Sequence, residues 1–348
     1  MIYFSSLIIL VIIFFIINFL FKDLKSKFNK EHQKFAGKVS IPLIGGVIIF
    51  CYLIVYINLF EELFLLYCFF LLLLGILSDT DKLHSPKIRL IIQILIISSF
   101  VYFSNLQILD LRNIYLNNIL SYEYFNIFFI TSCLLVLING SNFIDGLDGL
   151  NLGYYFVGFF PILYVSQLPE ISIANDQLIL IFILVSFLLV LNFLNIIYIG
   201  DSGSYLLGFV IGYLFIIFNN QNYLISPYFI ALILWYPAFE NLFSIIRKKI
   251  SNSDPLNPDN LHLHQKLYYL LLNSNFKLLS ENANPTASVL INLYNLLIFC
   301  IGALFFNETK ILLILILFNV LVYLSCYFLL KKRLIFFIRN YERIIDPK

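Results

Sequence analysis

Charged residues are scarce in this chain of 348 residues: only 12% are Asp, Glu, Lys or Arg, whereas 61% are hydrophobic. Soluble globular domains carry about 25% charged residues, so this shortage excludes a soluble domain. The short alternating pattern of a membrane barrel strand is also missing. Helices are therefore the element that can satisfy the hydrogen bonds of the chain's backbone in lipid. The composition therefore predicts an all-α, polytopic membrane protein, with residues 1–348 forming one integral domain.

Cysteine is rare as well, and its positions give no pattern for a disulfide or a zinc site. The five cysteines fall within apolar segments, which favours buried and inert thiols: Cys51, Cys68, Cys133, Cys300 and Cys326. No basic patch carries interleaved aromatic residues, so we expect no nucleic-acid partner. The first apolar run lacks a charged leader and a small-residue cleavage site, so we expect a retained span rather than a signal peptide.

Long apolar runs are what the chain has in abundance. A spanning helix needs about 20 apolar residues, and eleven segments come near that length: 2–21, 40–60, 63–78, 88–104, 124–139, 151–167, 177–194, 203–219, 226–246, 287–306 and 309–330. An odd number of spans places the two termini on opposite sides. We expect the apolar stretch Leu261–Leu272, which follows the ninth span, to lie at the interface or to pack under the bundle.

Lysine and arginine are distributed very unevenly between the two sides that these spans define. All but two of the 22 fall in segments on one side, namely 22–38, 82–89, 247–277 and 331–348. Arg112 and Lys310 are the two exceptions. Because cytoplasmic loops are enriched in Lys and Arg, this asymmetry predicts an external N-terminus and a cytoplasmic C-terminus.

Two polar loops on the predicted cytoplasmic side carry paired carboxylates. Asp79 and Asp81 follow the end of a span, where carboxylates can bind Mg²⁺ or accept a proton. Asp145 and Asp148 lie three residues apart, so on a helix they would share one face, and they need a cation nearby. Each loop read by itself also fits a solvated connector or a polar helix end.

Two further loops on this side add glycine, serine and histidine. Gly200, Asp201 and Ser202 run into an apolar span, which suits a phosphate cradle at a helix start, or ordinary capping. His262 and His264 would diverge on a helix and share a face only if extended. Phosphate contact or proton handling suits them better than zinc, because no Cys partner lies near. Arg247 lies seven residues after Glu240, near the same helix face, and also fits a simple membrane anchor.

The four loops together favour an enzyme over a transporter. A transporter would more often carry ionisable groups near the middle of the membrane, whereas here they gather at the ends of spans. Such a site suits one water-soluble substrate and one lipid substrate.

In their order and in their sequences, these loops resemble the motifs of the polyprenyl-phosphate N-acetylhexosamine-1-phosphate transferase family over about residues 30–270. Pro42–Gly46 resembles its Pro-x-x-Gly-Gly, Asn139–Leu150 its Asn-x-x-Asn-Phe-x-Asp-Gly-x-Asp-Gly-Leu, and Gly200–Ser204 its Gly-Asp-x-Gly-Ser. Asp259–His264 is similar to its Asp-Arg-x-His-x-His. The chain departs from the pattern where Ser78-Asp79 replaces an Asp-Asp pair, and at three other positions: Glu240, Asn260 and Gln265.

This resemblance implies transfer of a HexNAc-1-phosphate, of GlcNAc type, from a UDP-sugar to undecaprenyl phosphate, with release of UMP. That reaction begins a cell-envelope glycan such as O-antigen lipopolysaccharide or teichoic acid, on the cytoplasmic face of the bacterial inner membrane. The absence of a His-His-His pattern disfavours phospho-N-acetylmuramoyl-pentapeptide transferase. That enzyme and a lipid-linked sugar transporter stay as alternatives, and the oligomeric state, a homodimer included, is open.

The resemblance also assigns roles to residues. Asp201 is the expected ligand of Mg²⁺, for which Mn²⁺ can substitute, and Asp79 is the second metal candidate. Asp79 or Asp81 takes the place of the paired aspartates and orients or deprotonates the lipid phosphate. The other expected contacts to the metal shell or to the nucleotide-sugar come from Asp145, Asp148, His262, His264, Asn139, Asn142, Asn192, Gly200, Ser202 and Arg247.

Overall fold

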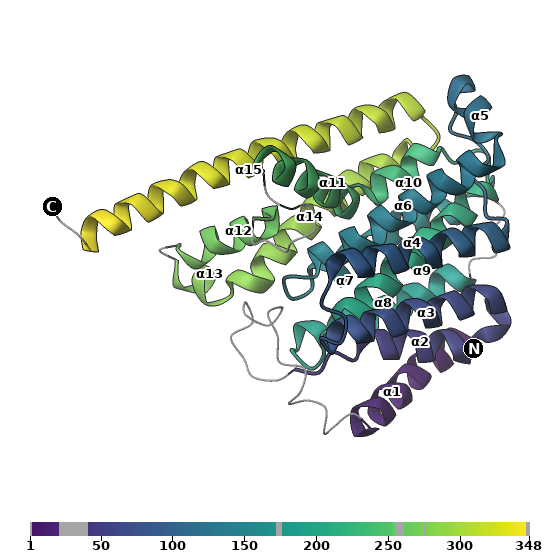
Figure 1. Ribbon diagram of the computed structural model, residues 1–348, viewed down its shortest axis with the longest axis horizontal. Coiled ribbons are helices and arrows are strands. Elements are labelled where there is room, and N and C mark those ends of the chain that lie inside the picture. The colour runs from purple at the N-terminus through teal and green to yellow at the C-terminus, as the bar shows by residue number, and fades with distance from the viewer. Residues whose placement is uncertain are drawn as a thin grey trace.

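A computed structural model describes residues 2–20, 41–171, 176–252, 254, 261–274 and 276–345. These residues form helices that run side by side in a bundle (Figure 1). Within these residues, eight helices are long and apolar enough to cross a membrane: α1 (Ile2–Leu20), α3 (Glu62–Asp79), α4 (Pro86–Ser104), α6 (Glu123–Ile144), α8 (Asp176–Phe193), α9 (Gly200–Asn220), α14 (Ala283–Leu304) and α15 (Thr309–Ile345). The predicted all-α, polytopic membrane architecture is therefore confirmed. The predicted loop 22–38 and the residues Asp259 and Asn260 lie outside the described residues.

Three of the eleven predicted spans have a different form. Helices α2 (Gly45–Val55) and α7 (Leu150–Ser166) are shorter than a usual span, and α2 continues into the 3₁₀ turn η3 (Ile57–Leu59). The predicted span 226–246 is broken into α10 (Pro227–Ile233) and α11 (Trp235–Ile250), which meet at 70°. Pro237 explains the break, because a residue without an N–H fits the first turn of a new helix better than the middle of a continuous one.

Helix α9 lies at the centre of the described bundle and packs against α2, α3 and α6. Glycines at the crossing points allow this packing, because small residues let the backbones of membrane helices approach closely. A Cβ added to Gly208 would lie 2.8 Å from Cα of Ile138 in α6, and one added to Gly75 in α3 would overlap the backbone of Ser202. These crossings bring the N-terminus of α9 against the C-terminal ends of α3 and α6.

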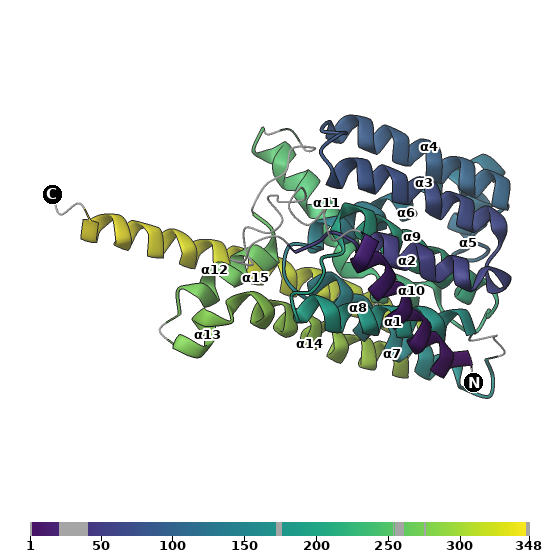
Figure 2. The ribbon, with the colours of Figure 1, turned by 90° about the horizontal axis from the view of Figure 1, so that it is seen from below.

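The remaining helices lie at the two ends of the bundle. Helix α5 (Ile114–Leu120) lies at one end, whereas α12 (Leu263–Leu272) and α13 (Lys277–Glu281) lie at the other. Helix α12 packs against α14 and α15, as expected for a segment under the bundle. Figure 2 shows the far end of α15 projecting beyond the other helices.

Candidate active site

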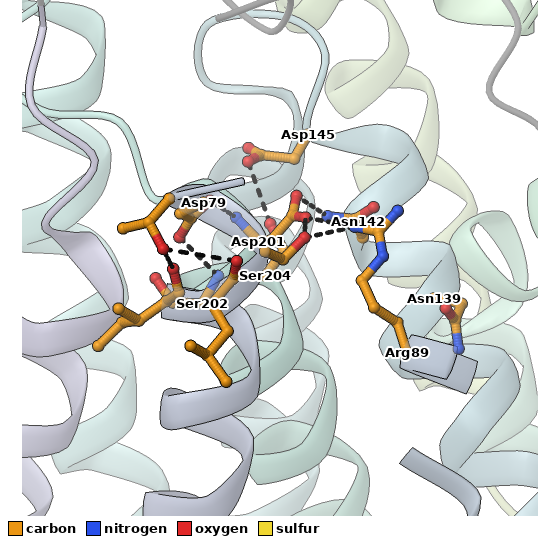
Figure 3. A network of polar contacts seen from close by, with 12 residues as sticks. Asp79, Arg89, Asn139, Asn142, Asp145, Asp201, Ser202 and Ser204 are labelled. Carbon is orange, nitrogen blue, oxygen red and sulfur yellow. Dashed lines mark hydrogen bonds and ion pairs between the residues drawn. The ribbon is translucent and has the colours of Figure 1, made fainter. Parts of the chain in front are cut away.

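Asp79, the last residue of α3, closes the N-terminus of α9. Its Oδ1 accepts the N–H of Asp201 at 2.8 Å, and its Oδ2 accepts the N–H of Ser202 at 3.1 Å (Figure 3). A carboxylate is favoured there, because these amides have no partner inside the helix and the helix dipole is positive at this end. Gly200 is needed for this approach, since its φ is +67° and an added Cβ would lie 2.8 Å from Asp79 Oδ2.

The expected phosphate cradle at Gly200 and Ser202 is therefore already filled by a side chain of the protein. Ser202 is fully buried, and its hydroxyl lies against Gly46 of α2. Both residues therefore have a packing role, and Gly200 also lines the cleft beside Asp145 and Asp148, so its contact with a ligand stays a prediction.

Asp201 is the most heavily bonded carboxylate of the site, and it is only 5% exposed. Its Oδ1 accepts Nδ2 of Asn142 at 2.6 Å, and its Oδ2 accepts Nη1 of Arg89 at 2.9 Å as well as the hydroxyl of Ser78. Arg89 also donates to the hydroxyl of Ser78. Side chains from α3, α4 and α6 thus converge on the first turn of α9.

Sequence reasoning missed Arg89 as a site residue. Arg89 belongs to the Lys and Arg residues that indicate the cytoplasmic side, and that explanation of its charge does not suggest a role in the site. One signal was present: Ser85 caps α4 and Pro86 starts it, so Arg89 stands one turn inside a helix that begins beside Asp79. Ser78, which replaces the family's aspartate, is the residue that Arg89 and Asp201 share.

Asp145 and Asp148 do not share a helix face as expected, because α6 ends at Ile144 and a turn follows. Oδ2 of Asp145 accepts the hydroxyl of Ser204 in α9 at 3.0 Å. Asp148 is held instead by Asn284 of α14, which accepts its N–H at 2.8 Å and donates to its Oδ2 at 3.1 Å. Both aspartates line a small cleft that Asn284 also borders.

The carboxylates of this site disfavour one another's charge. Desolvation raises the pKa of Asp145 well above its usual range, and the nearby carboxylates of Asp201, Asp79 and Asp148 raise it further, although the bond from Ser204 opposes the shift. Desolvation also raises the pKa of Asp148. Such a cluster favours a bound cation. No three His, Cys, Asp or Glu side chains among the described residues form a ready-made metal site; Mg²⁺ is usually held by one or two carboxylates plus substrate phosphates, so the donor set fits it.

The two histidines lie together beside this cluster. His262 is the N-cap of α12, with an extended backbone at ψ 155°, and Gln265 accepts its N–H at 3.1 Å. Because of that extended residue, the rings of His262 and His264 stack at 5.5 Å and 11°, so the divergence expected on a helix does not occur.

His264 faces the turn that carries Asp145. It is fully buried, its Nε2 lies 3.0 Å from the position of a Cβ on Gly146, and neither ring nitrogen has a hydrogen-bond partner among the described residues. Burial lowers its pKa to about 3, so the ring is neutral. The ring lies behind Gly146, which lines the cleft, and its two open nitrogens can each take one hydrogen bond, one as donor and one as acceptor.

Two of the predicted contact residues support the loops from within. Asn139 donates to Oε1 of Gln93 at 2.9 Å. Asn192 accepts the N–H of Gly149 at 2.6 Å and donates to the carbonyl of Ile197 at 3.1 Å, which joins the second and third loops. Asn139 therefore joins α6 to α4, whereas Asn192, which also lines the cleft, holds the second and third loops together.

Two other predicted residues lie away from the aspartates. Arg247 donates to the carbonyl of Leu261 at 2.7 Å and to the hydroxyl of Tyr327 at 3.2 Å, so it lies with α12 and α15. Asp81 lies in the exposed turn after α3, with φ at +54°. Of the two carboxylates left open by the sequence, Asp79 is the one that the fold brings to α9.

Comparisons with known proteins find sequences similar to this chain. Residues 62–219 match the model of glycosyl transferase family 4. The chain is 27% identical over 235 residues to the undecaprenyl-phosphate alpha-N-acetylglucosaminyl 1-phosphate transferase of Thermotoga maritima, covering 67% of this chain and 70% of the relative. It is 27% identical over 296 residues to the protein of that name in Escherichia coli, covering 80% and 75%. A relative from Bacillus subtilis, a probable undecaprenyl-phosphate N-acetylglucosaminyl 1-phosphate transferase, is 30% identical over 207 residues, covering 57% and 56%.

Proposed function

The chain belongs to glycosyl transferase family 4, and we propose that it transfers GlcNAc-1-phosphate from UDP-GlcNAc to undecaprenyl phosphate, with release of UMP. The observation that carries the proposal is the meeting of Asp79, Asp145 and Asp201 around the first turn of α9, from three loops far apart in the chain. The names of the relatives supply the acceptor, undecaprenyl phosphate, and the transferred group, N-acetylglucosaminyl 1-phosphate, whereas the UDP-linked donor is part of our proposal.

In the proposed reaction, an oxygen of the lipid phosphate attacks the β-phosphorus of the UDP-sugar. The bond from that phosphorus to the bridging oxygen breaks, and UMP leaves with this oxygen. Both substrates are anions, so the site must offset their repulsion. Arg89, whose Nη1 lies 2.9 Å from Oδ2 of Asp201, carries a positive charge at the site, and we propose that it contacts the phosphates.

Asp201 is our proposed ligand for Mg²⁺, with Asp79 beside it as the second candidate. When bound, the ion neutralises the diphosphate and stabilises the leaving UMP. Asn142 and Arg89 orient the Asp201 carboxylate through its two oxygens. Both oxygens of Asp79 accept amides of α9, so Asp79 is suited to positioning that helix rather than to accepting a proton.

The remaining parts of the proposal concern the second substrate and the orientation. His264 and Asp148 flank the turn of Asp145 and would contact the nucleotide-sugar. The charge asymmetry of the loops supports a site on the cytoplasmic face of the bacterial inner membrane. The apolar helices around the bundle would accommodate the isoprenoid chain of the acceptor.

The test is a purified enzyme in detergent with undecaprenyl phosphate and a panel of UDP-HexNAc donors, with UMP release as the readout. We expect UMP release with UDP-GlcNAc that depends on the lipid and stops with EDTA. Asp201→Asn should lower the release by about 10²-fold or more, whereas Asp81→Asn, in the exposed turn, is the matched control and should retain most of it. Movement of a lipid-linked sugar across vesicles without any UMP release would favour the transporter alternative.

A further inference from the structure

Glu240 of α11 is a buried carboxylate with two different partners. It is 1% exposed. Its Oε1 lies 2.8 Å from Nδ1 of His262, and its Oε2 accepts the hydroxyl of Tyr323 at 2.8 Å. A buried carboxylate is tolerated when both of its oxygens accept hydrogen bonds. His262 and Tyr323 therefore both stabilise the charge of Glu240, and the loss of one affects the bond to the other.

Tyr323 belongs to α15, well beyond the segment 62–219 that matches the family. Its ring is 2% exposed and packs edge-on against Phe239 at 4.9 Å and Phe243 at 5.3 Å, both from α11. This aromatic packing leaves the ring little freedom, and therefore its hydroxyl is aimed at Glu240.

The bond from Glu240 determines which nitrogen of His262 carries hydrogen. A carboxylate is an acceptor only, so Nδ1 of His262 must be the donor, and in the neutral ring Nε2 is then the acceptor. The ring stacks on His264 and lies 5.4 Å from the ring of Phe143, in the last turn of α6 just before Asp145. The chain of hydrogen bonds from α15 thus ends beside the candidate active site.

We propose that Tyr323 is a positioning residue, which acts through Glu240 to fix the tautomer and orientation of His262. The C-terminal helix α15 is in this way coupled to the site, as an outer partner is to a ligating or catalytic histidine in other enzymes. Only the effect on turnover rests on the proposed transferase function; the effect on the ring of His262 does not.

The tautomer can be read directly by ¹⁵N NMR of the histidine-labelled protein in nanodiscs, above the usual titration range of histidine. The chain has four histidines, so His262→Gln assigns the signal. We expect wild-type His262 to show the pure Nδ1–H pattern. Tyr323→Phe removes one hydroxyl and keeps the ring. The buried carboxylate of Glu240 then loses a donor that favours its ionised form, and a protonated Glu240 can donate to Nδ1 of His262 instead of accepting from it. We therefore expect a mixed tautomer pattern at His262.

The matched control is Tyr327→Phe, one helical turn further along α15. Its ring is parallel to that of Tyr323 at 6.3 Å and 8°, but its hydroxyl meets Arg247 instead of Glu240. We expect Tyr327→Phe to leave the His262 pattern unchanged. In the UMP assay, Tyr323→Phe should lower kcat about tenfold, the loss expected for one hydrogen bond to a charged group, with KM changed about twofold or less.

An unchanged His262 pattern in a folded Tyr323→Phe protein would overturn the proposal. If that variant does not fold, Glu240→Gln tests the same link from its centre, and a His262 pattern identical to wild type there would also overturn it. A wild-type protein with the pure Nδ1–H pattern but no UMP release would refute the transferase function and leave the coupling standing.

Discussion

The two ends of the helix bundle are held together by opposite means. At the end with the candidate site, Asp79, Asp145 and Asp201 crowd around the first turn of α9, and Arg89 is bonded directly to one of them. At the other end, Arg112 donates to the backbone carbonyls of Asn307, Tyr223 and Leu224, the latter two at 2.9 and 2.7 Å. One end places charge beside charge, whereas the other uses a charge to satisfy backbone groups.

This difference distinguishes a functional site from a contact that only stabilises the fold. Carbonyls at helix ends and in loops need donors, and a guanidinium satisfies several at once, so Arg112 adds stability to the loops it joins. Clustered, partly desolvated carboxylates cost stability, and proteins keep such arrangements where binding or chemistry needs them. Substitutions at the site end should therefore affect activity more than folding, and substitutions at the other end the reverse.

The largest expected effect follows from Asp201→Asn. The change keeps the shape of the side chain but removes the charge that would hold the metal, so UMP release should fall by about 10²-fold or more. The melting temperature in detergent should stay near that of wild type. Turnover close to wild type at limiting Mg²⁺ would show that Asp201 is not the metal ligand.

Arg112→Ala should produce the opposite result. Removing the guanidinium leaves the carbonyls of Asn307, Tyr223 and Leu224 without this donor, which should cost about 2 kcal/mol of unfolding free energy. Thermal unfolding followed by circular dichroism measures the loss, and UMP release at low temperature should be almost unaffected. A variant as stable as wild type but inactive would break the distinction between the two ends.

Asn284→Ala should weaken the site without removing a charge. Asp148 loses both of its contacts with α14, so the cleft loosens and UMP release should fall about tenfold, mainly through a higher KM for the UDP-sugar. Asn284→Asp is the informative companion, because it places a second carboxylate against Asp148 and should be the more harmful of the two. Steady-state kinetics at saturating lipid would measure both.

Asp145→Asn should make the protein more stable at neutral to basic pH. Folding raises the pKa of Asp145, so the folded state favours the protonated carboxyl. The stability that this proton contributes to the folded state is present at low pH and is lost as the pH rises through the raised pKa. In the absence of ligands the variant should therefore melt a few degrees above wild type at about pH 8, and the gap should narrow at about pH 5. A gap that widens toward acid would contradict the assigned direction of the shift.

Ser78→Asp should have the smallest effect. It restores the acidic pair of the family and adds a carboxylate beside Asp201 and Arg89. We expect near-normal turnover at saturating Mg²⁺ and a lower half-saturating Mg²⁺ concentration, because a second nearby carboxylate attracts the cation. A Mg²⁺ titration of UMP release would measure this, and a higher half-saturating concentration would mean that Asp201 is not where the ion binds.

Much of this protein is determined locally by its sequence. Apolar runs of spanning length define the long helices, because backbone groups in lipid have no other partners than those within the helix. The meeting of the motifs at one end of the bundle also follows from alternating spans, which return the ends of α3, α6 and the start of α9 to the same side. Asp79, Asp145 and Asp201 could be named as neighbours for that reason.

Tertiary structure decided what local patterns leave open. Whether Asp79 binds a phosphate or caps α9 depends on how closely α3 crosses α9 at Gly75, and the positive φ of Gly200 appears only in the folded chain. Asn284, Arg89 and Tyr323 reach the site by contacts across long sequence separations, with no spacing rule to indicate them. Sequence periodicity reports the faces of single helices, whereas the partner of a buried polar group is set by which helices pack together.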